Sequence, residues 1–148
     1  AGQIEQIGTA QEIYQRPATR FVADFIGKAN FLAARVVEQM DSHLQIETLG
    51  RQYFNVPRPT PAPRLGEKAT LVVRPEAVTL NRGGGLEGVI SRAAYLGARI
   101  EYEVSIAGER LEVVEQDPLR STLYPVGTQV IVGLIPELLY LLPKETAP

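Results

Sequence analysis

Cysteine is absent from the 148 residues of this sequence. Disulfide bonds and thiolate metal sites are therefore excluded, and a cytosolic location is compatible with the composition. Histidine occurs once, at position 43. Because no cluster of other ligands accompanies it, we expect His43 to be a solvated side chain and predict no metal site.

Long apolar runs and a strong excess of one charge are also missing. No apolar stretch approaches the roughly 20 residues that a membrane-spanning helix requires, and we see no signal peptide ahead of the fold. The formal net charge is -2. Such a composition lacks the clustered Lys and Arg that bind a phosphate backbone, so we expect no nucleic-acid partner.

What is present is an ordinary globular composition, with 45% hydrophobic and 22% charged residues. The length suits one domain, or a small domain with a tail. The sequence opens Ala1-Gly2 in the middle of a pattern, which is typical of a piece of a longer protein.

The first 27 residues predict a short strand, at residues 4–7, and then two short helices. Thr9 and Glu12 have the spacing of a capping box, in which each side chain accepts a hydrogen bond from a free backbone N–H. The second helix ends at Gly27, which suits a C-terminal cap. It carries an apolar stripe at helical spacing, made of Phe21, Val22, Phe25 and Ile26.

From about residue 30 the pattern changes to β-strands that come in two similar copies. Residues 65–76 align with residues 126–137, and a hairpin precedes each of these segments. We place the turn of the first hairpin at Gly50 and that of the second at Ala107-Gly108. The pattern therefore predicts an internal repeat.

The two repeats cover about residues 30–82 and 86–143. Neither repeat alone has enough strands to bury an apolar face. We therefore predict a mainly β fold in which both repeats close one small barrel and so remove exposed strand edges. The segment 82–85, which contains three glycines, is predicted to be a flexible linker, and residues 57–63 an extended, polyproline-like connector.

Both parts of the sequence resemble one known architecture. The motifs G-x-I-x-Q, E-I-Y-x-x-P and F-V-A-x-F-I-G occur in that order within residues 2–27. They resemble the last segment of the nucleotide-binding domain in ATP-binding subunits of bacterial ABC importers. The β-region resembles the TOBE domain, an OB-like barrel appended to such subunits, and this resemblance rests on Val73-Arg74-Pro75-Glu76, Gly88-Val89, Tyr95-Leu96-Gly97, Gly108-Glu109-Arg110-Leu111 and the strand of residues 127–132.

The resemblance implies that residues 1–28 are the tail of a nucleotide-binding domain and that residues 29–148 are a regulatory TOBE barrel. Importers of polyamines, iron(III), sulfate or maltose share this pattern, and the sequence does not choose among them. The implied role is noncatalytic regulation and dimerisation. The implied partners are the chain's own nucleotide-binding domain, a second copy of the subunit and the permease subunits, at the cytoplasmic face of the cell membrane.

The residues of an ATPase site are missing from the sequence. Gly27-Lys28 is followed by Ala29, and Val22 stands where a phosphate loop would need its first glycine. There is also no L-S-G-G-Q signature, magnesium-binding carboxylate pair or switch histidine. We therefore expect no enzyme activity and no cofactor in this chain, with ATP and magnesium bound by the parent protein.

Two turns hold candidate regulatory or interface residues. Arg74 and Glu76 follow an apolar strand, and Arg74 could bind an anion or a partner carboxylate. The alternative is a structural turn with a surface ion pair worth under about 1 kcal/mol. Tyr95, Gly97 and Arg99 form a hairpin turn that the resemblance places at a barrel mouth, where it could contact a ligand or a subunit. Its alternative is an ordinary turn.

The apolar stripe of the second helix needs a cover if its ATPase domain is absent. One hypothesis is that Phe21, Val22, Phe25 and Ile26 dock on a second copy of the chain, giving a dimer or a swapped arrangement. The alternative is disorder of this segment.

A free-standing barrel that binds an oxyanion or a sugar is the main alternative function. An oxyanion needs converging donors, whereas the candidate hydroxyl groups are scattered over Ser91, Ser105, Ser121 and Thr122. Oligonucleotide binding could use Tyr53, Phe54 and Tyr95 for stacking, but the charge balance opposes it.

Overall fold

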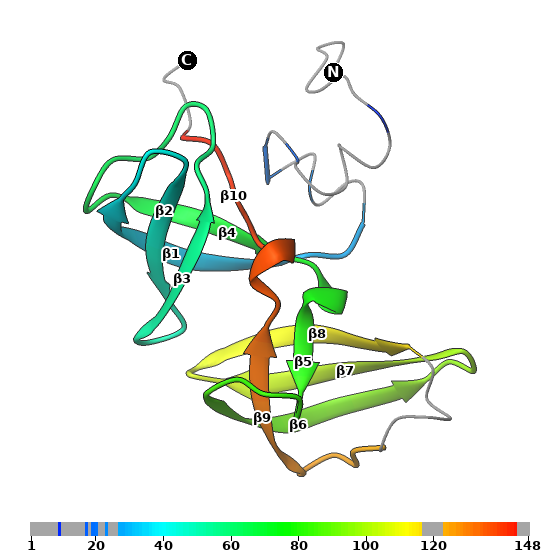
Figure 1. The fold of residues 1–148 in the computed structure, drawn as a ribbon. Helices are drawn as coiled ribbons and strands as arrows, with labels where there is room; N and C mark the ends of the chain where they lie inside the picture. The colour runs from blue at the N-terminus through cyan, green and yellow to red at the C-terminus, as the bar shows by residue number, and fades with distance from the viewer. Residues whose placement is uncertain are drawn as a thin grey trace. The chain divides into compact units, whose positions relative to one another are not determined.

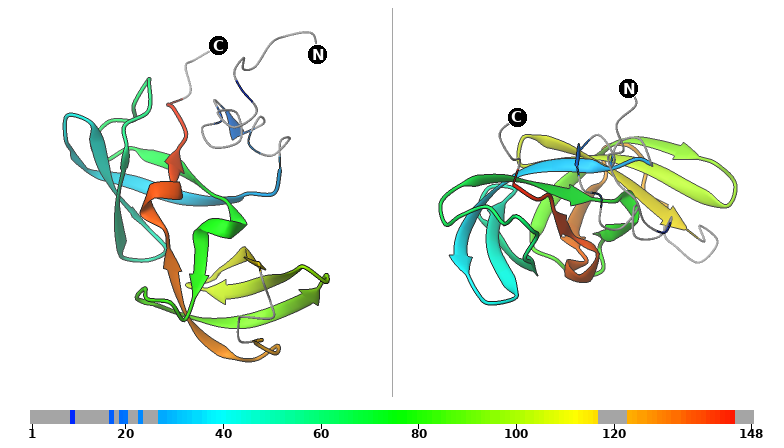
Figure 2. Two further views of the ribbon diagram at one scale, coloured as in Figure 1. Left: turned by 45° about the vertical axis from the view of Figure 1, so that its right-hand side comes forward. Right: turned by 90° about the horizontal axis from the view of Figure 1, so that it is seen from above.

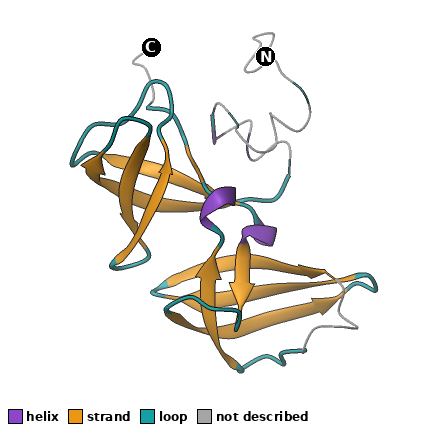
Figure 3. Ribbon diagram, in the orientation of Figure 1, coloured by secondary structure: helices purple, strands orange, loops and turns teal. Residues whose placement is uncertain are grey.

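The computed structural model describes residues 27–116 and 123–144, together with Thr9, Pro17, Thr19, Arg20 and Ala23. These residues form ten β-strands and two short 3₁₀ helices, so the prediction of a mainly β chain is confirmed (Figures 1 and 3). The strand and two helices expected within residues 1–27 lie almost entirely outside the described residues. So does the whole apolar stripe of Phe21, Val22, Phe25 and Ile26.

The chain divides into two compact units. Unit 1 comprises residues 1–73 and 136–148, and unit 2 comprises residues 74–135. The elements of unit 1 are β1 (Asn30–Gln39), β2 (His43–Thr48), β3 (Gln52–Pro57), β4 (Lys68–Val73), η2 (Pro136–Leu138) and β10 (Tyr140–Leu141). The elements of unit 2 are η1 (Pro75–Ala77), β5 (Val78–Leu80), β6 (Leu86–Tyr95), β7 (Arg99–Ile106), β8 (Glu109–Gln116) and β9 (Gln129–Leu134).

Each unit holds one antiparallel sheet of five strands, and each sheet takes one strand from the other repeat. The strand order is β10-β4-β1-β2-β3 in unit 1 and β5-β9-β6-β7-β8 in unit 2. β5 follows β4 in sequence but pairs with β9, whereas β10 follows β9 but pairs with β4 (Figure 1). The two edge strands of each sheet also contact each other, so each sheet curls into a nearly closed, OB-like barrel (Figure 2).

This topology corrects the prediction that the two repeats share one barrel. Each repeat forms four strands of one sheet and supplies the fifth strand of the other. The crossings follow β4 and β9, where Pro75 and Pro136 each open a 3₁₀ turn. Because proline has no N–H to donate, it ends the ladder and the chain takes a new direction.

The two repeats reproduce each other's hydrogen bonds at a bulge in their long first strand. In β1 the register shifts after Val36, whose N–H donates to Glu67 O over 3.1 Å and whose O accepts from Gly66 N over 2.8 Å. In β6 the register shifts after Ile90, which makes the corresponding bonds, of 2.9 and 2.8 Å, with the turn that precedes β9. A bulge bends its strand, so each long strand can pair with two neighbours in a curled sheet.

The two predicted hairpin turns are confirmed. Leu49 and Gly50 have φ of 50° and 83°, and Ala107 and Gly108 have φ of 49° and 80°. Two consecutive positive φ values define a type I′ turn, whose twist matches that of the strands it joins. These turns set the register of β2 with β3 and of β7 with β8.

Each sheet buries one face in a core of its own. The unit 1 core includes Leu32, Val36, Leu44, Ile46, Val56, Leu71 and Leu141, and the unit 2 core includes Leu80, Ile90, Ile100, Tyr102, Val104 and Leu111. Full burial of each such aliphatic side chain contributes about 1.5–3 kcal/mol. Ala23 packs with Val72 and Leu142 in a separate cluster of unit 1.

Candidate functional site

Arg74 and Glu76 lie at the crossing from β4 to η1, as expected from the sequence. Arg74 has an extended backbone (φ -67°, ψ 148°), is 5% exposed, and its O accepts a hydrogen bond from Ala77 N over 2.8 Å. Glu76 is exposed, and both residues already have interaction partners. Little of Arg74 is therefore open to a ligand from solvent. The corresponding residue before η2 is Ile135, so the turn itself does not require a guanidinium group.

Tyr95, Gly97 and Arg99 form one hairpin turn between β6 and β7. Leu96 N–H donates to Arg99 O over 2.9 Å, and Gly97 has φ of 74°, a left-handed conformation that favours glycine. Tyr95 and Leu96 are 56% and 50% exposed. The turn therefore displays an aromatic and an aliphatic side chain side by side on the surface.

A row of side chains that sequence reasoning missed begins at this turn. Tyr95 pairs with Ile100, and Ile100 pairs with Glu115 on β8. Directly opposed residues point to the same face of a sheet, and Ile100 belongs to the core. Glu115 is thus a carboxylate on the core face, 8% exposed. The alternation of Leu111, Val113 and Glu115 was the signal that could have revealed it.

Burial raises the pKa of the Glu115 carboxyl, and the nearby Arg82 opposes this shift only in part. The Arg82 Nη2 atom lies 3.5 Å from Glu115 Oε2, and its side chain is largely exposed. Arg82 was assigned to a flexible linker from the sequence. Its ion pair instead joins the end of the β5 segment to β8.

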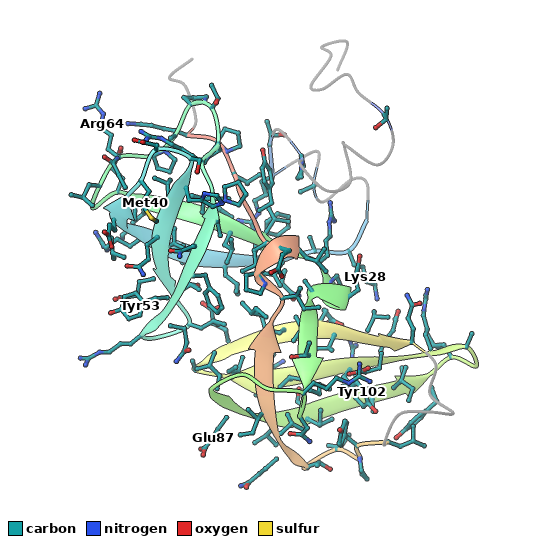
Figure 4. The ribbon with its side chains drawn as sticks, in the orientation of Figure 1. Lys28, Met40, Tyr53, Arg64, Glu87 and Tyr102 are labelled. Carbon is teal, nitrogen blue, oxygen red and sulfur yellow. The ribbon has the colours of Figure 1, made fainter. Side chains whose placement is uncertain are left out.

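Tyr102 lies next to this row in the core of unit 2 (Figure 4). Its hydroxyl oxygen accepts a hydrogen bond from Tyr124 N over 3.2 Å, and the two rings are 6.0 Å apart between centroids. Burial, as the main cause, raises the pKa of the Tyr102 phenol. The hydroxyl is satisfied inside the fold and acts as structural support.

The outer face of the same sheet carries paired charges. Arg92 Nη2 lies 3.1 Å from Glu112 Oε1, and Arg110 Nη1 lies 3.8 Å from Glu103 Oε1. Ser91 Oγ donates to Glu103 Oε1 over 3.0 Å. Partly exposed pairs of this kind stabilise a fold by at most about 1 kcal/mol each.

Among the residues that it describes, the structure does not bring together the hydroxyl groups considered for an oxyanion or the aromatic rings considered for oligonucleotide stacking. Ser91 is bonded to Glu103, and Ser121 and Thr122 lie outside the described residues. Tyr53 and Phe54 are adjacent on β3 and therefore point to opposite faces. They cannot form a shared stacking platform. Tyr53 also bonds with Glu47, which raises the pKa of its phenol.

His43 is exposed, as expected, and its Nδ1 lies 2.8 Å from Ser42 Oγ. In the part of the chain that the structure describes, no three His, Cys, Asp or Glu side chains gather into a metal site. The same residues contain no helix long and apolar enough to cross a membrane.

Comparison with known proteins identifies the family. Residues 71–142 match the TOBE domain. The chain is 36% identical over 133 residues to the Fe(3+) ions import ATP-binding protein FbpC of Brucella suis, covering 88% of this chain and 36% of that protein. It is 35% identical over 116 residues to the spermidine/putrescine import ATP-binding protein PotA 1 of Pseudomonas aeruginosa, covering 76% and 31%.

A third relative, the Fe(3+) ions import ATP-binding protein FbpC 1 of Rhizobium meliloti, is 39% identical over 120 residues, which cover 77% of this chain and 32% of the relative. The chain thus spans about a third of the length of these curated relatives. The chain belongs to the TOBE family and carries the C-terminal TOBE domain of an ABC importer ATP-binding subunit.

Proposed function

We propose that this chain is the noncatalytic regulatory and dimerisation region of an importer's ATP-binding subunit. The observation that carries the proposal is the TOBE match within a chain that aligns with about a third of several import ATP-binding proteins. In this account the parent protein binds ATP and magnesium in a separate nucleotide-binding domain. This chain contributes no catalytic group.

The proposed partners are that nucleotide-binding domain, the permease subunits and a second copy of the subunit. The parent would lie in the cytoplasm, peripherally on the inner face of the cell membrane. The named relatives, which import Fe(3+) ions or spermidine and putrescine, support this assignment without selecting a substrate. An effector could regulate the importer here only if it binds one arrangement of the dimer better than the other.

We infer that the turn of Tyr95, Gly97 and Arg99 contributes to the contact between the two copies. Tyr95 and Leu96 are half exposed there, and aromatic side chains are enriched in protein interfaces. We expect Arg74 and Glu76 to stabilise the fold behind this contact. Arg74 is buried at the first residue of unit 2 and so is not itself available to a second copy.

A cysteine crosslink tests this contact, since the chain has no cysteine of its own. Under mild oxidation, Leu96→Cys should give a disulfide-linked dimer of the chain at low micromolar concentration. Leu65→Cys, at an exposed turn of unit 1, is the control and should stay largely monomeric. Equal crosslinking of the two variants, or none in either, would contradict the proposed contact.

A further inference from the structure

Unit 1 contains a pocket whose described lining includes none of Arg74, Glu76, Tyr95, Gly97 and Arg99. Its volume is about 810 Å³, within the usual range of small-molecule sites. Among the described residues, three cationic and three hydroxyl side chains line it: Arg20, Lys68, Lys144, Thr19, Thr60 and Thr70. We call it the basic pocket.

The described lining of the basic pocket comes from four segments, and hydrogen bonds hold three of them together. Leu142 N–H donates to Thr70 O over 2.9 Å, which fixes the segment after β10 against β4. Lys144 N–H donates to Pro61 O over 2.8 Å, which fixes the same segment against the proline-rich loop. Leu142 and three prolines add apolar surface between the charged groups. The pocket is therefore a built feature of unit 1.

Two of the three cations are held in place. The Arg20 guanidinium carbon lies 4.4 Å from the centroid of the Phe31 ring, a cation–π contact. Lys144 Nζ lies 3.0 Å from Glu67 Oε1, and the same carboxylate accepts a hydrogen bond from Arg64 N over 2.7 Å. Hydrogen bonds from Arg64 and Lys144 lower the pKa of Glu67, so it remains ionised and anchors Lys144.

No Asp or Glu is among the described residues that line the basic pocket. Glu67 offsets the charge of Lys144 from outside the lining, whereas Arg20 and Lys68 face the space without a lining carboxylate. Like charges gathered around one cavity repel each other, and an anion between them removes that repulsion. Threonine hydroxyls can donate further hydrogen bonds to its oxygen atoms.

We propose that the basic pocket binds a small organic anion that carries two or three carboxylate or phosphoryl groups. Three cationic side chains on one pocket favour a ligand with more than one anionic group, and the proline and leucine surface favours an organic body over a bare ion. All lining residues belong to unit 1. Binding therefore does not depend on the regulatory role proposed above.

The test is a titration of the full 148-residue chain with citrate, followed by amide NMR shifts and by calorimetry. We expect saturable shifts centred on Lys68, Thr70 and Lys144. Lys68→Gln should weaken citrate binding at least about fivefold, which corresponds to about 1 kcal/mol, and Lys68→Arg should restore most of it.

Arg51→Gln is the matched control, because it removes one exposed positive charge from another part of unit 1. It should change the citrate affinity by less than about twofold. A neutral sugar of similar size should cause no shifts in the pocket. The proposal is overturned if citrate shifts do not saturate at millimolar concentrations, or if Arg51→Gln weakens binding as much as Lys68→Gln.

Discussion

Gly84 lies at the junction between the two repeats, at a position where the fold leaves no room for a side chain. The sequence suggested a flexible linker, but Gly84 packs on β9. A Cβ atom added to Gly84 would lie 2.5 Å from Val132 O and 2.6 Å from Gly133 Cα. Gly133 in turn has no room for a side chain, since its Cβ would lie 2.7 Å from Thr79 Oγ1. The glycines allow the junction to lie directly on the β5–β9 pair.

Gly84→Ala should therefore destabilise the chain more than Gly83→Ala. Both positions have similar left-handed φ values, 106° and 97°, so each substitution carries about 1–3 kcal/mol of backbone strain. Gly83 has open space around it, whereas Gly84→Ala adds a steric overlap. Urea unfolding of the two variants measures the difference. An equal loss of stability in the two variants would contradict a steric overlap at Gly84.

Glu115 gives a prediction about pH. Its pKa is raised in the folded chain above the ordinary value of 4.5, so folding favours the protonated carboxyl. The protonated Glu115 thereby stabilises the folded chain. This stabilisation is complete below about pH 4.5 and is lost as the pH rises through the raised pKa. At neutral pH the ionised Glu115 therefore lowers the stability of the fold.

Glu115→Gln should raise the melting temperature at pH 7, and the gain should shrink as the pH falls toward 4.5. Thermal unfolding across this range measures it. Glu112→Gln, on the opposite face of β8, is the control. It removes a partly exposed pair with Arg92 and should lower stability by at most about 1 kcal/mol. A Glu115→Gln variant that is less stable than the parent chain at pH 7 would contradict the assignment.

At the scale of elements, the hairpins could be predicted from the sequence. The strand that each repeat supplies to the other sheet, β5 or β10, could not. Gly50, Gly97 and Gly108 marked turns that the structure confirms, and β7 alternates apolar and polar residues as a half-buried strand should. These signals are local. The pairing of β10 with β4 joins residues about 70 positions apart through two short segments, and no local pattern encodes it.

For the candidate site, too, the sequence predicted the turn that has a local signal but not the burial of individual side chains. The turn at Tyr95, Gly97 and Arg99 followed from its glycine, and its place between β6 and β7 is as expected. The burial of Arg74 was not foreseen, because a charged residue beside proline usually marks a surface turn. Glu115 was missed because a carboxylate on a core face contradicts the binary pattern used to find cores.

Removal of residues 136–148 should affect unit 1 far more than unit 2. The deletion takes away β10, whose Leu141 is fully buried, and also the nearly buried Leu139 and Leu142. Each lost leucine costs about 1.5–3 kcal/mol of hydrophobic burial. Hydrogen exchange of backbone amides should therefore show lost protection in β4, while β6 and β7 stay protected.

The matched control is removal of residues 145–148 alone, which keeps β10 and should leave protection of β4 unchanged. If the longer deletion also left β4 protected, β10 would not be an essential strand of this sheet. If the longer deletion removed protection equally from both units, unit 2 would also depend on β10. That result would contradict the topology, in which β10 pairs only within the unit 1 sheet.

At the scale of the whole molecule, the exchanged strands tie the two halves of the sequence together. Unit 1 is complete only with residues from both ends of the described chain, and unit 2 lies between them in sequence. A change in β5 or β10 therefore affects the sheet built mainly by the other repeat. This interdependence is compatible with the regulatory role that we propose for the chain.

The most direct test of the central claim is the rate of ATP hydrolysis by the parent subunit, assembled with its permease, with and without residues 29–148. We predict that the deleted subunit still hydrolyses ATP but loses regulation of that rate, and that the isolated chain hydrolyses none. Hydrolysis by the isolated chain, or complete loss of hydrolysis from a deleted subunit whose nucleotide-binding domain remains folded, would contradict a noncatalytic regulatory role.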